Sequence, residues 1–267
     1  MRVVADNLYD YPRYYDLVFG SDWKAEFDFL RAVFDTHASG RVRRVFEPAC
    51  GTGRLLFRMA RAGYRVSGLD LNRRAVDYCN RRLVRHGLPG STHVGDMADF
   101  QLARPVDAAF NTINSFRHLL TEEAARSHLR CVARSLRQGG IYVLGLHLTP
   151  TAGQPLDEER WSARRGHLAI NTYLATYDLD LADRTERCRM VMDVYTPTER
   201  RQLVDDLVFR TYTAEQLQRL LATVPELQLI ATYDFCYRID SPIEIAANTQ
   251  DVVLILKRLR RAPATRP

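Results

Sequence analysis

The chain has 267 residues, of which 46% are hydrophobic and 26% are charged, and its formal net charge is +6 at pH 7. An apolar fraction of this size excludes a chain that is disordered over most of its length, and the length suffices for one large domain or two small ones. The longest apolar runs, Ile141–Leu146 and Val252–Leu256 among them, fall far short of the roughly 18–20 residues of a membrane-spanning helix.

The positive charge comes almost entirely from arginine, because only Lys24 and Lys257 of the 38 basic residues are lysine. Two interpretations are open. One is a preference for arginine over the whole surface, and the other is a nucleic-acid or phosphate partner, whose contact surface normally concentrates its charge. Here the arginines are dispersed, with small groups at 41–44, 81–85 and 258–261, so the first interpretation is favoured.

The five cysteines are odd in number and widely scattered, which indicates neither a disulfide framework nor a metal knuckle: Cys50, Cys79, Cys131, Cys188 and Cys236. The histidines show no metal-ligand spacing either. Met1 is followed by acidic residues without an apolar segment, so no secretory signal is expected. We therefore expect a cytoplasmic protein with no metal and no membrane partner.

The N-terminal segment Leu8–Phe19 is rich in tyrosine and precedes a predicted helix at Asp22–His37. We expect residues 1–40 to form a helical lid over a ligand, with Tyr14 and Tyr15 as its contact residues. Packing of these tyrosines under the first helix is an equally good alternative.

Between residues 41 and 150, short apolar runs alternate with amphipathic helical patterns. Strands are expected at Arg44–Cys50, Arg65–Leu71, Thr92–Asp96, Asp107–Thr112 and Ile141–Leu148. Helices are expected at Gly53–Ala62, Asn72–His86 and Thr121–Arg137, the second capped by Asn72 and the third closing at Gly139-Gly140. This alternation is typical of βαβ units and of a parallel sheet covered by helices on both faces.

The pattern changes after the fifth strand. Three long runs without helical periodicity predict an antiparallel sheet within an insert at 151–211: His167–Leu179, Thr185–Tyr195 and Arg200–Arg210. The α/β pattern resumes over 212–260, with a helix at Ala214–Ala222 and strands at Gln228–Phe235 and Asp251–Lys257, and 261–267 is expected to be a flexible tail.

One segment points to chemistry, Val45-Phe-Glu-Pro-Ala-Cys-Gly-Thr-Gly-Arg54, where a strand runs through a glycine turn into a helix. Glycines let the backbone approach a ligand, and the free N–H groups of the helix start favour a polar or anionic group. The next strand ends at Asp70, where a carboxylate can accept hydrogen bonds from both ribose hydroxyls of a nucleoside. A nicotinamide site would have a third glycine where this chain has Leu56, which weighs against NAD.

The stretch Glu47-Pro-Ala-Cys-Gly-Thr-Gly53 resembles the first motif of class I S-adenosylmethionine-dependent methyltransferases. The resemblance continues in order with Gly68–Asn72, His93–Met97, Asp107–Ser115 and Leu136–Gly140, and it covers about residues 8–150 and the C-terminal strand pair. It implies an α/β fold: a doubly wound, mostly parallel seven-stranded sheet with an antiparallel last strand, here with an inserted antiparallel β-sheet. Such inserts are typical of small-molecule methyltransferases.

The resemblance implies S-adenosyl-L-methionine as the cofactor and S-adenosyl-L-homocysteine as its product. Glu47 would anchor the methionine amino group, and the turn Ala49-Cys50-Gly51, with Gly53, would wrap the methionine moiety. Ala49 stands where the family has glycine, which is a mild departure. Cys50 is interpreted as a small turn residue and not as a nucleophile, because no basic neighbour in the sequence marks it as activated.

The adenosine half of the cofactor is assigned in the same way. The resemblance implies that Asp70 binds the ribose hydroxyls while Leu71 packs on the adenine. Asp96 would accept from the adenine amino group, with Met97 beside it, and Asn111 would face the sulfonium. Asp70, Asp96 and Glu47 also have simpler interpretations, as a helix cap, a turn residue and the partner of an arginine.

The methyl acceptor is less determined than the cofactor. Transfer from a sulfonium is an in-line displacement in which the protein supplies alignment and a dry pocket. An oxygen acceptor generally needs a base, whereas an amine needs only to be deprotonated and aimed. The candidate catalytic residues are His118, just after the fourth strand, His147, at the end of the fifth, and Tyr14. A purely structural role is the commoner one for such histidines.

The inserted sheet is expected at the carboxyl edge of the parallel strands, where ligands of open α/β sheets bind. It can serve as a lid over the acceptor, as the surface of a homodimer, or as a cover for apolar area. Tyr15, Trp161 and Arg165 are the candidate residues of the substrate pocket.

We therefore expect methyl transfer by in-line displacement to a nitrogen or oxygen of a small-molecule acceptor. The alternatives are an RNA or protein methyltransferase, suggested by the pI of about 9.2, and a non-catalytic module that holds the cofactor or its product. The sequence after the fourth strand, Asn111-Thr-Ile-Asn114, lacks the proline pair of adenine-N6 enzymes, and the chain has no Pro-Cys pair of the cytosine-C5 class. A nucleic-acid partner is thus disfavoured.

Overall fold

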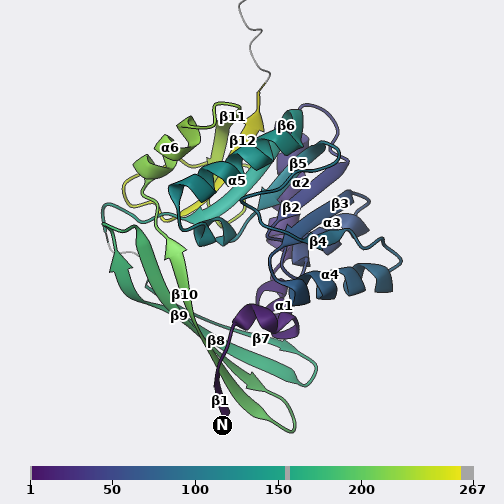
Figure 1. Cartoon of the computed structure of the whole chain (residues 1–267), viewed down its shortest axis with the longest axis vertical. Helices are drawn as coiled ribbons and strands as arrows, with labels where there is room; N and C mark the ends of the chain where they lie inside the picture. Colours follow the sequence, from purple (N-terminus) through teal and green to yellow (C-terminus); the bar gives the residue numbers. More distant parts are fainter. Residues whose placement is uncertain (1, 154–156, 260–267) are drawn as a thin grey trace, which may run out of the picture.

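The computed structural model describes residues 2–153 and 157–259, so the expected tail at 261–267 lies outside the described residues. Over these ranges the chain forms a seven-stranded sheet flanked by helices and a separate five-stranded sheet (Figure 1). No helix in the described ranges is long and apolar enough to span a membrane.

The larger sheet has the strand order β11-β12-β6-β5-β2-β3-β4. Its strands are β2 (Arg44–Pro48), β3 (Arg65–Asp70), β4 (Thr92–Val94), β5 (Val106–Asn111), β6 (Leu136–His147), β11 (Leu227–Tyr233) and β12 (Asp251–Arg258). Strands β2 to β6 pair in parallel, whereas β12 runs antiparallel to both β6 and β11. The predicted fold class, including the antiparallel last strand, is confirmed.

Helices bury both faces of this sheet. The helices α2 (Lys24–His37), α3 (Arg54–Arg61) and α4 (Arg73–Arg85) share one apolar core, and α5 (Glu122–Ser135) and α6 (Ala214–Ala222) share the other. Successive strand residues alternate between the two cores, as Val143 and Leu144 do in β6. Burial on both faces explains why the central strands read as continuous apolar runs. Each large aliphatic side chain buried there contributes roughly 1.5–3 kcal/mol.

Side-chain caps fix where three of these helices begin. Asn72 Oδ1 accepts from the amide of Ala75 at 3.0 Å, and Thr121 Oγ1 accepts from the amide of Ala124 at 3.1 Å. Thr213 and Gln216 form a reciprocal capping box at the start of α6. Because each cap satisfies an N–H group that the helix leaves unpaired, it is worth about 1 kcal/mol.

The junction between α5 and β6 differs from the sequence prediction. The helix ends at Ser135, and β6 begins at Leu136 and not at Ile141, because Leu136 already pairs with Val106 of β5. The glycines at 139 and 140 therefore lie inside the strand. A Cβ on Gly140 would stand 2.9 Å from two backbone oxygens, so this close approach admits only glycine.

The smaller sheet has the order β1-β10-β9-β8-β7, with β1 (Arg2–Ala5), β7 (Glu158–Arg165), β8 (Leu168–Asp180), β9 (Thr185–Tyr195) and β10 (Arg200–Arg210). Strands β7 to β10 form the predicted antiparallel meander, and β1 adds to β10 in parallel. The sequence analysis did not predict β1 or β7. Most β7 residues are polar and exposed, so this strand carries little apolar signal, and β1 is defined by its pairing with β10.

Residues 2–40 divide between the two sheets. The 3-10 turn η1 (Leu8–Asp10) and α1 (Pro12–Gly20) bury Leu8 and Leu17 against Met192 and Leu203 of the smaller sheet. Helix α2 packs instead into a core of the larger sheet. Residues 2–20 thus pair with or pack against the smaller sheet, which lies below the larger one in Figure 1.

Candidate active site

A cavity of about 550 Å³ lies where the carboxyl ends of β2, β3 and β5 meet the N-terminal segment and the smaller sheet. Of the predicted site residues, it brings together Tyr15, Ala49, Gly51, Asp70, Leu71, Met97 and His118. Residues that the sequence analysis missed also line it, mainly from η1, α1 and strands β8 to β10: Asn7, Leu8, Tyr9, Phe19, Leu174, Met190, Leu207 and Phe209.

The turn between β2 and α3 has the left-handed backbone that its glycines suggest. Gly51 and Gly53 have φ of +51° and +68°, and Ala49 adopts φ of +52° despite its side chain. A Cβ on Gly53 would lie 2.2 Å from Cys79 Sγ of α4, so only glycine fits. Gly53 and Cys50 support the turn without lining the cavity. Burial raises the pKa of the Cys50 thiol well above its usual value, which keeps it an inert thiol.

Asp70 ties this turn to the end of β3. Its Oδ2 accepts from the amide of Gly51 at 2.7 Å, and its Oδ1 accepts from the amide of Asn72 at 2.8 Å. Burial raises the pKa of this carboxyl, and the two amide hydrogen bonds oppose the shift. Each carboxylate oxygen keeps acceptor capacity for a further donor in the cavity.

Two residues beside Asp70 suit a flat apolar ligand. Leu71 lines the cavity, and it is 70% exposed, which is a large fraction for a leucine. Met97, which lies in the segment after β4, is buried and lines the cavity. Asp96, the predicted adenine acceptor, does not line the cavity; its Oδ1 accepts from the amide of Ala98 at 2.7 Å.

Beneath the turn, two buried polar oxygens lack a hydrogen-bond partner, Glu47 Oε2 and Asn111 Oδ1. Glu47 is 7% exposed, and burial raises its pKa well above the usual value while the nearby Arg54 opposes this. A buried carboxylate oxygen without a donor is unfavourable, so this site would gain from a cationic ligand group that reaches Oε2. Asn111 donates from Nδ2 to the carbonyl of Pro48 at 2.8 Å and does not line the cavity, where Asn114 stands instead.

The opposite wall holds a pair formed by Tyr9 and His118. The Tyr9 hydroxyl lies 2.9 Å from His118 Nε2. Burial, aided by the charge of Arg117, lowers the pKa of His118 to about 4, so its imidazole is neutral at pH 7. Burial also raises the pKa of Tyr9 well above its usual value, which keeps its hydroxyl protonated. The pair can therefore offer one neutral donor and one neutral acceptor.

Like Glu47, Cys50, Gly53, Asp96 and Asn111, four further predicted residues are not among those that line the cavity. His147 Nδ1 lies 2.6 Å from Asp251 Oδ1, because β6 and β12 pair these two residues directly. Tyr14 stacks on Tyr11 with ring centroids 5.8 Å apart. Trp161 packs on Phe19, which does line the cavity. Arg165 Nη1 lies 3.3 Å from Asp16 Oδ2.

Asp16 of α1 joins these parts of the molecule. Although it is only 3% exposed, its carboxylate accepts from Thr52 Oγ1 and from the Tyr78 hydroxyl, both at 3.2 Å. It also pairs with Arg82 of α4 and with Arg165 of β7. A single buried carboxylate thus fixes α1 against the glycine turn and the smaller sheet, which holds the cavity's cover in place.

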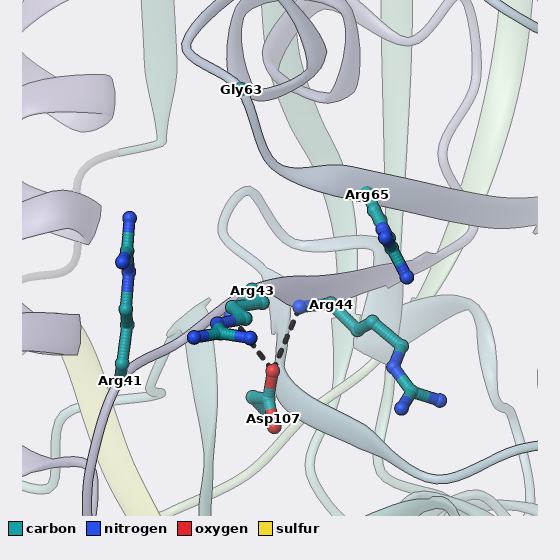
Figure 2. Close-up of a pocket in the computed structure, with 6 residues that line it drawn as sticks. All are labelled: Arg41, Arg43, Arg44, Gly63, Arg65 and Asp107. Atoms are coloured by element: carbon teal, nitrogen blue, oxygen red, sulfur yellow. Dashed lines mark hydrogen bonds between the residues drawn. The ribbon is translucent and has the colours of Figure 1, made fainter.

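A second hollow, of about 360 Å³, lies at the other edge of the larger sheet (Figure 2). Its wall includes Arg41, Arg43, Arg44 and Arg65 at the amino ends of β2 and β3, around Asp107. Asp107 Oδ2 accepts from the amides of Arg43 and Arg44 at 2.7 and 2.8 Å, whereas the guanidinium groups spread apart from one another (Figure 2). This arginine-lined hollow is separated from the first cavity by the length of the strands, roughly 15–20 Å for five or six residues.

Comparison with known proteins identifies the central stretch. Residues 45–140 match a family model described as a methyltransferase domain. A dTDP-3-amino-3,4,6-trideoxy-alpha-D-glucopyranose N,N-dimethyltransferase from Streptomyces venezuelae is 28% identical over 139 residues, which are 51% of this chain and 56% of that protein. The chain thus spans about half the length of the curated relatives that it matches.

Solved structures resemble the chain over nearly its whole length. An S-adenosylmethionine-dependent methyltransferase from Clostridium acetobutylicum superposes with a TM-score of 0.76 at 16% identity, covering 95% of this chain and 100% of that one. The sugar N-methyltransferase KedS8 from Streptoalloteichus sp ATCC 53650 superposes with a TM-score of 0.72 at 19% identity, covering 96% and 94%. At such identities the likeness shows a shared fold.

Proposed function

We propose that this chain, whose residues 45–140 form a methyltransferase domain, is a class I S-adenosylmethionine-dependent methyltransferase acting on a nitrogen of a small molecule. The observation that carries the proposal is that one cavity joins the Gly51–Asp70 turn to the Tyr9–His118 pair. A donor bound at the first and an acceptor held at the second would then share a common space.

The cofactor assignment rests on complementary chemistry. Asp70 would accept from the ribose hydroxyls, and the exposed Leu71, with Met97, would cover the adenine. Glu47 would take the α-ammonium of the methionine moiety, because its Oε2 is buried without a partner. The bound cofactor supplies an activated methyl group on a sulfonium.

The acceptor nitrogen must reach the cavity with a free lone pair. An amine with an ordinary pKa of about 10 is charged in water, but apolar surroundings disfavour the charged form and lower that pKa. The nitrogen lone pair would then form the new N–C bond as the C–S bond of the methyl donor breaks, and the resulting ammonium would release its proton to water. A His118 of pKa about 4 is too weak to remove a proton from an ammonium, so we assign it an orienting role with Tyr9.

The lack of a strong base in the cavity lining favours nitrogen over oxygen as the acceptor atom. An alcohol acceptor needs a strong base, and the titratable side chains that line the cavity, as far as the structure describes it, are Asp70, His118 and the two tyrosines Tyr9 and Tyr15. Asp70 is used by the turn, and burial raises the pKa of Tyr15 to about 12. The Streptomyces venezuelae relative named above is an N,N-dimethyltransferase, as its name states.

The RNA alternative finds little support in the charge distribution. The arginine-lined hollow of Figure 2 opens at the amino ends of the strands, whereas the proposed methyl donor would lie at their carboxyl ends. A nucleic acid held there would not present a base to the cofactor. The predicted homodimer through the smaller sheet stays a prediction.

Methyl transfer itself tests the proposal. The purified protein would be incubated with S-adenosylmethionine and a panel of primary and secondary amines, with matched alcohols as controls. We expect mass spectrometry to detect N-methylated amines together with stoichiometric S-adenosylhomocysteine. Tight cofactor binding without methylation of any acceptor would favour a non-catalytic binding module, and methylation of the alcohols alone would contradict the assignment to nitrogen.

A further inference from the structure

The half of the cavity that faces away from the glycine turn is apolar, and this feature bears on the acceptor. We define the acceptor wall as Leu8, Phe19, Leu174, Met190, Leu207 and Phe209, which come from η1, α1, β8, β9 and β10. Tyr9 and His118 supply polar atoms beside it, and both groups are neutral at pH 7. The uncharged side chains of Asn7, Asn114 and Ser115 also line the cavity. An entering acceptor therefore meets hydrocarbon and neutral hydrogen-bonding groups.

The cavity offers an anion no cation. Among the residues that the structure describes, its lining includes neither lysine nor arginine, and Asp70 is its one carboxylate. Ligands that carry phosphate are normally held by arginine, lysine, a metal or a helix N-terminus. The helix N-terminus in this site, at α3, lies at the glycine turn, on the side that we assign to the cofactor.

Two arginines that lie close in the chain to lining residues, Arg117 and Arg54, are held by carboxylates. Arg117 lies over the ring of Phe209, 5.1 Å from its centroid, donates from Nε to the carbonyl of Arg210 at 3.0 Å and pairs with Glu186. Arg54 forms a bidentate, largely buried ion pair with Glu26, in which Nη1 and Nη2 donate to the two carboxylate oxygens at 2.5 and 2.7 Å. Either arginine could turn toward the cavity only by leaving a buried carboxylate uncompensated, which is strongly unfavourable.

A phosphate or diphosphate group in this space would lose its hydration without gaining a counter-charge. An uncharged apolar group would instead gain from the burial of its surface against the acceptor wall. We infer that the acceptor is an amine carried on an apolar, phosphate-free skeleton, in contrast to the nucleoside-diphosphate sugars in the names of the curated relatives. The inference rests on the proposed function.

Binding to the product-loaded protein tests it without requiring turnover. The protein is first saturated with S-adenosylhomocysteine, and calorimetry at about pH 9 then measures the affinity of phenethylamine and of thymidine diphosphate as probes. We expect phenethylamine to bind at least about tenfold more tightly, with an affinity that changes little with salt because burial of apolar surface drives it.

The outcomes separate the two proposals. The protein can bind S-adenosylhomocysteine and then bind thymidine diphosphate as tightly as phenethylamine or more tightly, or bind neither probe. Either result overturns the inference and leaves the methyltransferase assignment standing. Failure of S-adenosylhomocysteine itself to bind overturns the proposed function and the inference with it.

A substitution locates the probe on the acceptor wall. Leu207→Gln should weaken phenethylamine binding about tenfold and leave S-adenosylhomocysteine binding near that of the parent, since Leu207 belongs to β10 and not to the glycine turn. Leu181→Gln is the matched control, because Leu181 is 60% exposed between β8 and β9. Equal affinity for phenethylamine in both variants would show that the acceptor wall does not bind it. The probe comparison on the parent protein stands even if Leu207→Gln fails to fold.

Discussion

The hydroxyl of Tyr9 lies 2.9 Å from Nε2 of His118, although 109 residues separate the two in the chain. Tyr9 belongs to the N-terminal segment that accompanies the smaller sheet, and His118 ends the 3-10 turn that follows β5. Phe209 of β10 packs on the same imidazole, with ring centroids 4.8 Å apart. The acceptor side of the cavity is therefore assembled from three distant parts of the chain.

Removal of the Tyr9 hydroxyl should impair the reaction without affecting cofactor binding. Tyr9→Phe keeps the ring and deletes the bond to His118, whose net worth is about 1 kcal/mol, or roughly a fivefold change. We expect kcat/KM for the amine to fall by about that factor while the affinity for S-adenosylhomocysteine stays constant. Tyr14→Phe is the matched control, because Tyr14 stacks on Tyr11 and does not line the cavity. Equal losses in the two variants would remove Tyr9 from the acceptor site.

Replacement of the buried carboxylate Glu47 should separate stability from binding. Glu47→Gln removes an ionisable group whose Oε2 is buried without a partner, so we expect the ligand-free protein to unfold at the same or a higher temperature. Affinity for S-adenosylmethionine should fall about tenfold or more, because the ammonium loses its counter-charge. Thermal unfolding and calorimetry measure the two effects, and parallel losses of both would mean that Glu47 is purely structural.

The raised pKa of Glu47 also predicts a pH dependence of binding. An ammonium ligand favours the ionised carboxylate, so binding releases a proton from any Glu47 that is protonated in the free protein. Affinity for S-adenosylmethionine should then increase as pH rises toward that raised pKa. Glu47→Gln should remove this dependence. Calorimetric titrations of parent and variant across the same pH range provide the comparison, and an unchanged slope in the variant would assign the dependence to another group.

Two glycines with nearly the same positive φ allow strain to be separated from a steric clash. Gly53 has φ of +68° and would place a Cβ 2.2 Å from Cys79 Sγ, whereas Gly87 has φ of +70° with nothing within 4 Å. Gly87→Ala should cost only the left-handed strain, about 1–2 kcal/mol of unfolding free energy. Gly53→Ala should cost more and should also weaken cofactor binding, because the turn must shift. Urea unfolding and calorimetry test this, and equal costs would mean that Cys79 moves away freely.

Acid should destabilise the fold through buried histidines. His128 is fully buried between the Met97 carbonyl and the Tyr142 hydroxyl, and desolvation lowers its pKa to about 4 from about 6.5. The unfolded chain thus binds the proton more tightly, and the stability associated with neutral His128 is lost as pH falls from about 6.5 toward about 4.

Between pH 7 and pH 5 this linkage should cost the parent about 2 kcal/mol from His128 alone. In His128→Gln the drop in unfolding free energy over the same interval should be smaller by about that amount, whatever the variant's stability at pH 7. Urea midpoints at the two pH values give both drops. An identical drop in parent and variant would show that His128 does not titrate in this way.

The backbone around the glycine turn could be predicted because its signals are local, whereas the cofactor contacts that we assign to it stay a proposal. The glycine turn, Asp70 and the cap at Asn72 lie within short segments whose residue types dictate a backbone conformation, and the structure has them as expected. The fold class followed from the alternation of strands and helices, which depends on the same short-range patterns.

Apart from His118 and Tyr15, the wall that we assign to the acceptor could not be predicted, because it depends on long-range pairing. His147 stands at the end of β6, where a base would be useful, but its neighbour in β12 is Asp251, and this contact depends on the register of an antiparallel pair. Leu207 and Phe209 reach the cavity only because β10 pairs with β9 and lies under η1. No local sequence pattern indicates these two contacts. Tyr9 was one of four clustered tyrosines, and its local sequence gives no sign of the contact that it makes with the distant His118.

The central claim, that this cavity binds S-adenosylmethionine through Asp70, is tested most directly by calorimetric titration of S-adenosylhomocysteine into the parent, Asp70→Ala and Asp77→Ala proteins. Asp77 is exposed on α4 and serves as the matched control. We predict that the parent and Asp77→Ala bind equally and do not bind NAD, and that Asp70→Ala loses about 1–3 kcal/mol of binding free energy. Binding by Asp70→Ala as tight as that of the parent would contradict the account.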